Sequence, residues 1–435
     1  MSLPIEMYQC MKALLMPLIL SLILALPFVA AKSSRTDIQG ICKNVSPITN
    51  IPECSPWEHQ HVVERGKVLK RIGGKAKSDG RWNPRTTLLD ALHAFDRYQE
   101  TAGAEIQRFE DLYRNVPKGH KRMLERIISY NKNFEEARSR IEINARLCKL
   151  IVNHGLEYYN ITRAELSVFE KENEKTAKKP AHRSMVSQAL KHMVRDYSPE
   201  GKPERDATFP YILSTIFSEL SLPPADSYSK GYKILLPGSA LGGLAHEISL
   251  LGPHLHITTN EYSSSMNLAY RYISSSSVLT TPIAIHPYLE TWSHARNRAS
   301  IFRPVEIYPP ASNPGHPPPL LIEGDFTLSF HHQPSHYDMI GTLFFIDTAQ
   351  NLLSYLETIF TLLRPGGVWV NVGPLLYGTA PWLQLSKEEV VMVAEEVGFV
   401  FEEEFEKEGV GYDFGMGGLY QHQYVGLFWR ARKPM

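Results

Sequence analysis

The sequence YKILLPGSALGG, residues 232–243, joins a short apolar run to a turn made of small residues. The run Tyr232–Leu236 has the length and composition of a buried strand of a parallel sheet, and it stops at Pro237 and Gly238. Residues 244–251 then show the apolar spacing of a helix. A strand, a tight turn and a helix in this order predict the first unit of an open α/β sheet.

Further apolar runs continue this pattern toward the C-terminus. The other strand candidates are residues 255–259, 320–322, 337–345, 368–372, 399–401 and 424–429. Helix candidates between them are residues 264–272, 352–363 and 387–397. The last of these helices opens with Ser386 followed by Glu389, the spacing of a capping box. Strands that alternate with helices predict a parallel sheet covered by helices on both faces.

Composition divides the whole chain into four parts. Residues 1–35 contain a hydrophobic segment, and residues 36–57 form a polar, proline-containing linker. Residues 58–225 repeat apolar side chains every three or four positions and are predicted to be helical. Residues 226–435 form the α/β domain, with a proline-rich insertion at about residues 275–319. We expect this insertion to be functional, because structureless loops of that length are uncommon inside compact domains.

Composition also excludes several classes of protein. Lys+Arg and Asp+Glu both number 46, and this balance argues against a protein that binds nucleic acid through bulk charge. With 43% hydrophobic and 21% charged residues, the chain is neither disordered nor fully embedded in a membrane. The 4 cysteines include no C-x-x-C pair, so no metal site is expected.

The N-terminal hydrophobic segment, residues 13–31, carries no charge. It is close to the ~20 residues that a helix needs to cross a bilayer. Basic residues on its C-terminal side, such as Lys32 and Arg35, favour a membrane anchor that leaves the body of the protein in the cytoplasm. The small residues Val29 and Ala31 also suit a signal peptide, which would place the protein in the lumen of the secretory pathway. Without this segment the protein would be cytosolic.

Two features at the ends of predicted strands indicate a nucleotide-containing cofactor. The small-residue turn, residues 238–243, would allow a ligand to lie against the backbone. Glu261 ends the second strand, where a carboxylate can accept hydrogen bonds from a ribose diol. After the next strand, Asp325 could accept from the amine of adenine while Phe326 packs on its ring. Both NAD(P) and S-adenosylmethionine fit such a site, and the missing G-x-G-x-x-G spacing favours S-adenosylmethionine.

Three sequence blocks in the α/β domain carry a family resemblance. They are FFIDTAQN at 344–351, RPGG at 364–367 and NVGPLLY at 371–377. Together with VRDYS at 194–198, LPG at 236–238, NEYS at 260–263 and GDF at 324–326, they resemble the carnosine N-methyltransferase family over about residues 55–434. The resemblance implies a class I, Rossmann-like S-adenosylmethionine-dependent methyltransferase preceded by a helical region. It also implies methylation of a ring nitrogen of the histidine imidazole in carnosine, which gives anserine.

The resemblance also implies roles for individual residues. The cofactor-binding positions are His192, Arg195, Gly238, Glu261, Asp325, Phe326 and Leu343. Arg195 would bind the methionine carboxylate of the cofactor through a charge-assisted contact. Asp347 would act on the substrate imidazole, and Tyr412 and Tyr424 would complete the substrate site. A carboxylate that accepts the N–H of one ring nitrogen leaves the other nitrogen free for methylation and stabilises the imidazolium product.

One departure from the family pattern concerns the substrate. Gly378 stands where the family has a substrate-site histidine directly after the GPLLY block. Two hypotheses therefore remain: an N-methyltransferase acting on carnosine or a related imidazole peptide, or a cofactor-binding relative with no turnover or with another substrate. A histidine nearby in the sequence could take the place of the missing one, and the candidates are His331, His332 and His336, although solvated loop histidines are the more common interpretation of such residues.

Overall fold

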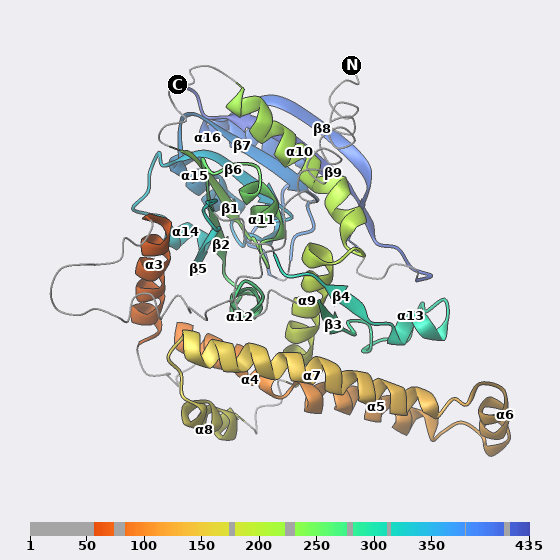
Figure 1. The fold of residues 1–435 in the computed structure, drawn as a ribbon. Helices are drawn as coiled ribbons and strands as arrows, with labels where there is room; N and C mark the ends of the chain where they lie inside the picture. Colours follow the sequence, from red (N-terminus) through yellow and green to blue (C-terminus); the bar gives the residue numbers. More distant parts are fainter. Residues whose placement is uncertain are drawn as a thin grey trace, which may run out of the picture.

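The structure is a computed structural model, and it describes most of the chain beyond the N-terminal region. The described residues are 56–73, 83–173, 179–221, 231–275, 282–310, 315–378, 380–412 and 418–435. Figure 1 shows a twisted sheet flanked by helices, a layer of helices beneath it, and a helical arm that extends to one side.

The central sheet has seven strands. They are β1 (Tyr232–Pro237), β2 (Leu255–Glu261), β5 (Leu320–Glu323), β6 (Tyr337–Leu343), β7 (Leu363–Gly373), β8 (Val400–Gly411) and β9 (Gln423–Arg432). Their order is β5-β2-β1-β6-β7-β9-β8. Each predicted strand is present, but the predicted all-parallel sheet is wrong at one position. Strand β9 runs antiparallel to both β7 and β8, because no helix crosses over between β8 and β9 in the described residues. This mixed order is that of a Rossmann-like methyltransferase fold.

Helices cover both faces of this sheet, as the sequence predicts. They are α10 (Lys202–Leu220), α11 (Gly243–Ser249), α14 (Phe326–Ser329), α15 (Leu352–Leu362) and α16 (Lys387–Val397). Successive residues of β1 point to opposite faces. Leu235 packs into the core formed with α15 and α16, whereas Ile234 and Leu236 pack into the core formed with α10 and α11. Because both faces of β1 are buried, its sequence is a nearly continuous apolar run.

The predicted capping box of α16 is confirmed. The hydroxyl of Ser386 accepts from the backbone N–H of Glu389, and the Glu389 carboxylate accepts from the backbone N–H of Ser386 at 2.7 Å. Both N–H groups lie at the helix N-terminus, where no backbone partner is available within the helix.

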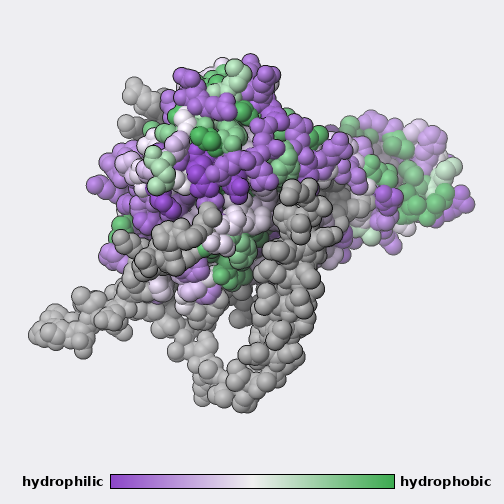
Figure 2. Space-filling view, turned by 90° about the horizontal axis from the view of Figure 1, so that it is seen from above, coloured by the Kyte–Doolittle hydropathy of each residue, from purple (hydrophilic) through white to green (hydrophobic). Residues whose placement is uncertain are grey.

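Residues before the sheet fold into a helical layer. It consists of α3 (Pro56–Ile72), α4 (Pro84–Asp96), α5 (Tyr98–Tyr113), α6 (Lys118–Ile128), α7 (Lys132–Tyr158), α8 (Arg163–Asn173) and α9 (Lys179–Tyr197). Helices α4, α7 and α9 pack against α12 (Ser264–Ile273), which follows β2, so the layer and the sheet share a continuous core. Helices α5 and α7 form the arm, with α6 at its end (Figure 1). Exposed apolar residues lie on the arm near that end (Figure 2), among them Met123 and Ile127.

The insertion extends the helical layer instead of forming a free loop. It contains a hairpin of β3 (Ile283–Ile285) and β4 (Val305–Ile307) with α13 (Arg298–Phe302) between them. The buried side chain of Asn144, on α7, donates to the carbonyl of His286 and accepts from its N–H, both at 2.8 Å. The N–H of Tyr308 donates to the carbonyl of Tyr197 at 2.8 Å. The insertion is thus fixed to both α7 and α9.

The structure does not support the predicted membrane anchor, and we withdraw it together with the localisation inferred from it. Over the described ranges, no helix combines the length and the low charge needed to cross a membrane. The longest, α7, carries charged residues along one face and buries the other against protein. Residues 13–31, on which that prediction was based, lie outside the described residues.

Asn144 gives a test of how the insertion is held. We expect Asn144→Ala to lower the free energy of unfolding by about 1–3 kcal/mol, because it leaves the buried N–H and C=O of His286 without partners. Urea denaturation measures this change. Asn153→Ala, at an exposed position of the same helix, is the control and should change the stability by less than about 0.5 kcal/mol. Equal effects of the two substitutions would contradict this account.

Candidate active site

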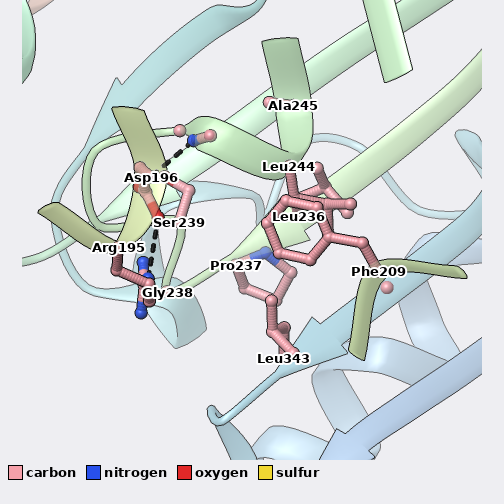
Figure 3. Close-up of a pocket in the computed structure, with 13 residues that line it drawn as sticks. Arg195, Asp196, Phe209, Leu236, Pro237, Gly238, Ser239, Leu244, Ala245 and Leu343 are labelled. Carbon is pink, nitrogen blue, oxygen red and sulfur yellow. Dashed lines mark hydrogen bonds and ion pairs between the residues drawn. The ribbon is translucent and has the colours of Figure 1, made fainter. Parts of the chain in front are cut away.

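A cavity lies at the carboxyl end of β1, over the small-residue turn (Figure 3). Three of the predicted cofactor residues, Arg195, Gly238 and Leu343, line it together. Gly238 has a φ of +64°, and a Cβ atom at this position would lie 2.3 Å from the ring of Phe345. Only glycine fits both the left-handed backbone and this close contact. The turn therefore leaves bare backbone facing the cavity.

Arg195 reaches the cavity from the last turn of α9. Its Nε donates to Oδ1 of the neighbouring Asp196 at 2.7 Å, and Oδ2 of Asp196 accepts from the N–H of Gly243 at 3.2 Å. Burial alone would lower the pKa of Arg195, but the adjacent Asp196 carboxylate raises it above its ordinary value. Arg195 is therefore a permanent cation beside Gly238 (Figure 3). Asp196 was not predicted as a site residue, although it lies next to Arg195 in the VRDYS block.

His192 lies one turn before Arg195 on α9. Burial, together with the charge of Arg195, lowers the pKa of His192 well below its ordinary value. The imidazole is therefore neutral at physiological pH, and it adds no charge to the cavity.

Glu261 ends β2 with its carboxylate against the turn. Its Oε2 accepts from the N–H of Ala240 at 2.8 Å, and its Oε1 accepts from the N–H of Ser263 at 2.7 Å. Burial raises the pKa of Glu261, while these backbone donors and the charge of Arg195 oppose that shift. The two hydrogen bonds fix the carboxylate between the small-residue turn and the start of α12.

Asp325 and Phe326 follow β5, beside the end of β2. The N–H of Gly324 donates to the carbonyl of Glu261 at 2.9 Å, which joins the two strand ends. Asp325 caps α14, and its Oδ1 accepts from the N–H and the hydroxyl of Thr327 at 2.8 and 2.6 Å. Phe326 is buried, with its ring edge-to-face against Phe345 at 5.4 Å.

Asp347 lies in a short 3₁₀ helix, η2 (Ile346–Thr348), directly after β6. It is 5% exposed, and its Oδ2 accepts from the N–H of Leu376 at 2.9 Å. Burial raises the pKa of Asp347 to about 6, against the effect of its backbone hydrogen bonds. At neutral pH the group is a carboxylate held in a poorly solvated place.

Tyr412 and Tyr424 meet around Phe344, three residues before Asp347. Their ring centroids lie 5.3 and 6.2 Å from that of Phe344, and 6.3 Å from each other. Burial raises the pKa of both tyrosines, and the charge of Asp347 raises each further. The structure thus brings the three predicted substrate residues together.

All these groups lie at one edge of the sheet. Strands β1, β2, β5, β6 and β7 are parallel, so their carboxyl ends share that edge. Glu261, Asp325 and Asp347 each lie at or just beyond such an end.

The histidines suggested as substitutes for the missing one are elsewhere. His331, His332 and His336 precede β6, so they lie at the opposite, amino edge of the sheet, and all three are exposed. That hypothesis was wrong, because closeness in sequence did not account for the length of β6. Gly378 is exposed, with no atom within 4 Å of where its Cβ would be.

The raised pKa of Asp347 predicts a pH-dependent cost in stability. The folded state binds the proton of Asp347 up to about pH 6, whereas an unfolded Asp releases it near pH ~4. The contribution of Asp347 to the free energy of unfolding therefore falls as pH rises between these values. We expect Asp347→Asn to stabilise the protein by about 2–3 kcal/mol at pH 8 and to have little effect below pH ~4.

Denaturant unfolding at both pH values measures this difference. Asp206→Asn removes an exposed carboxylate on α10 and should show no such gain at pH 8. A stabilisation by Asp347→Asn that is the same at both pH values would contradict the assignment of the raised pKa.

Comparison with known proteins agrees with the family resemblance of the sequence. The family model described as "Carnosine N-methyltransferase" matches residues 172–435. The carnosine N-methyltransferase of Mus musculus is 28% identical over 355 residues, 79% of this chain and 85% of that protein. That of Schizosaccharomyces pombe is 29% identical over 341 residues, 72% of this chain and 86% of that protein.

Among solved structures, phosphoethanolamine N-methyltransferase 2 of Haemonchus contortus is 12% identical with a TM-score of 0.36, covering 61% of this chain and 60% of that one. No function follows from a likeness at that level. The family model, the relatives and the sheet order together show that the chain belongs to the carnosine N-methyltransferase family and is an S-adenosylmethionine-dependent N-methyltransferase.

Proposed function

We propose that the protein transfers the methyl group of S-adenosylmethionine to a ring nitrogen of the imidazole of carnosine or of a closely related histidine dipeptide, which gives anserine or its analogue. The observation that supports this most directly is the buried Asp347 carboxylate, which accepts from the N–H of Leu376 and whose charge raises the pKa of both tyrosines. The mouse and fission yeast relatives carry the name of this activity.

The residues around the turn fit the cofactor chemically. The Arg195 guanidinium, a permanent cation, suits the methionine carboxylate. The fixed carboxylate of Glu261 retains lone pairs for the ribose hydroxyls. Asp325 uses Oδ1 to cap α14, and we assign Oδ2 to the exocyclic amine of adenine. When bound, the cofactor supplies an electrophilic methyl group on a sulfonium.

His192, Phe326 and Leu343 complete the proposed cofactor site in different ways. Leu343 lines the cavity directly, beside Gly238. His192 lies one turn before Arg195 on α9. Phe326, predicted to pack on the adenine ring, is buried edge-to-face against Phe345, the ring that lies against Gly238. We therefore assign His192 and Phe326 to support of the site walls, close to the groups that face the cofactor.

Asp347 provides the chemistry on the acceptor side. Its carboxylate accepts the N–H of one ring nitrogen, and this fixes the tautomer so that the other nitrogen presents its lone pair. As that nitrogen is methylated the ring becomes cationic, and the buried carboxylate stabilises the developing charge. A pKa of about 6 lies close to that of an imidazole, so Asp347 is also suited to accept the proton that the product loses.

Tyr412, Tyr424 and Phe344 form the walls of the proposed substrate site. Aromatic faces bind a flat imidazole by stacking, and they attract the imidazolium product through cation–π interaction. Reacting atoms must be held at about 3–3.5 Å with their orbitals aligned, which flat walls on two sides favour.

A second candidate function is cofactor binding without turnover of carnosine. The observation that favours it is Gly378, which offers no side chain where family members have a histidine. A methyl-transfer assay with labelled cofactor and a panel of histidine dipeptides decides between the two. Labelled product supports the methyltransferase, and cofactor binding with no product from any dipeptide supports the second candidate.

The cofactor assignments predict a loss of binding. Glu261→Ala and Arg195→Ala should each weaken S-adenosylmethionine binding about 10-fold to 100-fold, since each removes a charged hydrogen-bonding partner. Calorimetry measures the affinity, and thermal unfolding of the same samples verifies that the variants are folded. Glu357→Ala, an exposed acid on α15, is the control. Wild-type affinity in both variants would refute the assignments.

The role of Asp347 predicts a loss of turnover alone. Asp347→Asn keeps an acceptor for the N–H of Leu376 but carries no charge to stabilise the imidazolium. We expect kcat to fall about 100-fold or more while the affinity for S-adenosylmethionine stays unchanged. Single-turnover methyl transfer measures the chemical step. A rate within a factor of three of the wild type would exclude Asp347 from the reaction.

A further inference from the structure

The C-terminal hairpin carries a histidine that the family resemblance does not assign. We infer that His422 binds the α-carboxylate of the histidine dipeptide and so selects substrates with a free C-terminus. This inference rests on the proposed function, because it concerns the substrate of the same site.

The ladder between β8 and β9 places His422 on the substrate side of the hairpin. Val410 pairs with Tyr424 and Gly411 with Gln423, and the N–H of Tyr412 donates to the carbonyl of His422 at 3.0 Å. Opposed residues, and residues two apart on one strand, point to the same face of a sheet. Tyr412, His422 and Tyr424 therefore share a face.

The rings are also in contact. The imidazole of His422 is centred 4.6 Å from the ring of Tyr424, which in turn lies beside Phe344. His422 is partly buried, unlike the exposed His331 and His332 at the other edge of the sheet. It therefore stands one aromatic ring away from the place proposed for the substrate imidazole.

This separation suits the shape of a histidine dipeptide. The α-carboxylate of a histidyl residue is separated from its imidazole by only the α- and β-carbons. With the substrate imidazole at Asp347 and against the tyrosines, we place the carboxylate toward the neighbouring ring, which is His422.

A substrate carboxylate at this position needs hydrogen-bond donors, because the nearby carboxylate of Asp347 would repel it. Burial raises the pKa of Tyr424, and the charge of Asp347 raises it further. The charge of Arg195 lowers the pKa of Tyr412, against the larger effect of burial. Arg195 is, however, paired with Asp196 and is assigned to the cofactor. Beside the tyrosine hydroxyls, the imidazole N–H of His422 is a hydrogen-bond donor available to a substrate carboxylate placed among these groups.

The insertion holds this part of the hairpin in place. The N–H of Leu419 donates to the carbonyl of His294 at 2.7 Å, and the ring of His294 lies 5.3 Å from that of Tyr420. Tyr420 in turn lies 6.3 Å from His422. The insertion, which is fixed to α7 and α9, thus supports the segment that carries His422 directly before β9.

The experiment compares carnosine with its C-terminal amide in the full-length protein. For wild type we expect kcat/KM to be at least about 10-fold higher with carnosine than with the amide. His422→Ala should lower kcat/KM for carnosine about 10-fold to 100-fold, mainly through KM, and should leave the amide unchanged. His422→Asn, which keeps an N–H donor, should restore part of the loss. S-adenosylmethionine affinity should stay at the wild-type value, and His332→Ala is the matched control.

The outcomes separate this inference from the proposed function. Equal losses with both substrates, or no loss with either, overturn the carboxylate contact while leaving the methyltransferase intact. If wild type turns over no dipeptide, calorimetry with carnosine and its amide on protein saturated with S-adenosylhomocysteine replaces the rate measurement. Tighter binding of carnosine that depends on His422 then supports the inference, and no binding of either dipeptide overturns it together with the proposed substrate.

Discussion

The carboxylate of Asp196 joins the two halves of this protein at the point where the candidate site begins. One oxygen binds the Arg195 guanidinium, and the other accepts from the N–H of Gly243 at the start of α11. A buried carboxylate is costly unless it is paired and hydrogen-bonded, and both conditions are met here. The same bonds fix the last turn of α9 against the turn after β1. The helical layer thereby contributes a cation to a cavity that the sheet alone would leave neutral.

Two buried carboxylates at the sheet edge have different surroundings, and their proposed roles follow from this difference. Glu261 accepts from two backbone N–H groups and feels the charge of Arg195, which favour its ionised form and fix its position. Burial raises the pKa of both groups, but at Asp347 only backbone hydrogen bonds oppose it, and the pKa of Asp347 rises to about 6. A fixed acceptor suits ribose hydroxyls, which stay neutral. An acceptor that titrates near pH 6 suits an imidazole, which in the proposed reaction gains a methyl group, becomes cationic and then loses its N–H proton.

Much of the fold could be predicted from sequence because both faces of the sheet are buried. The inner strands then read as apolar runs, as in 232–236 and 368–372, and the small-residue turn marks a strand end. The edge strand β8 is largely exposed and charged, so the sequence predicted only its first residues. The reversed direction of β9 was missed, since apolar runs carry no information on direction. Asp196 and His422 were missed for a related reason. Asp196 binds the distant Gly243, and His422 is brought to the site by its pairing with Tyr412 and by the contact of Tyr424 with Phe344, none of which local spacing indicates.

The segment after β6 connects the donor and acceptor sides of the site. Phe344 adopts a φ of +50°, an uncommon conformation for an aromatic residue. A Cβ atom at Gly373 of β7 would lie only 3.0 Å from the backbone nitrogen of Phe344, so the glycine leaves room for this bend. This bend turns Phe344 toward the two tyrosines, places Phe345 under Gly238, and brings Asp347 to Leu376. Residues 344–347 therefore connect the small-residue turn with the walls of the proposed substrate site. Because methyl transfer requires the two reactants to be aligned within a fraction of an ångström, one rigid turn that positions both is the simplest way to hold that alignment.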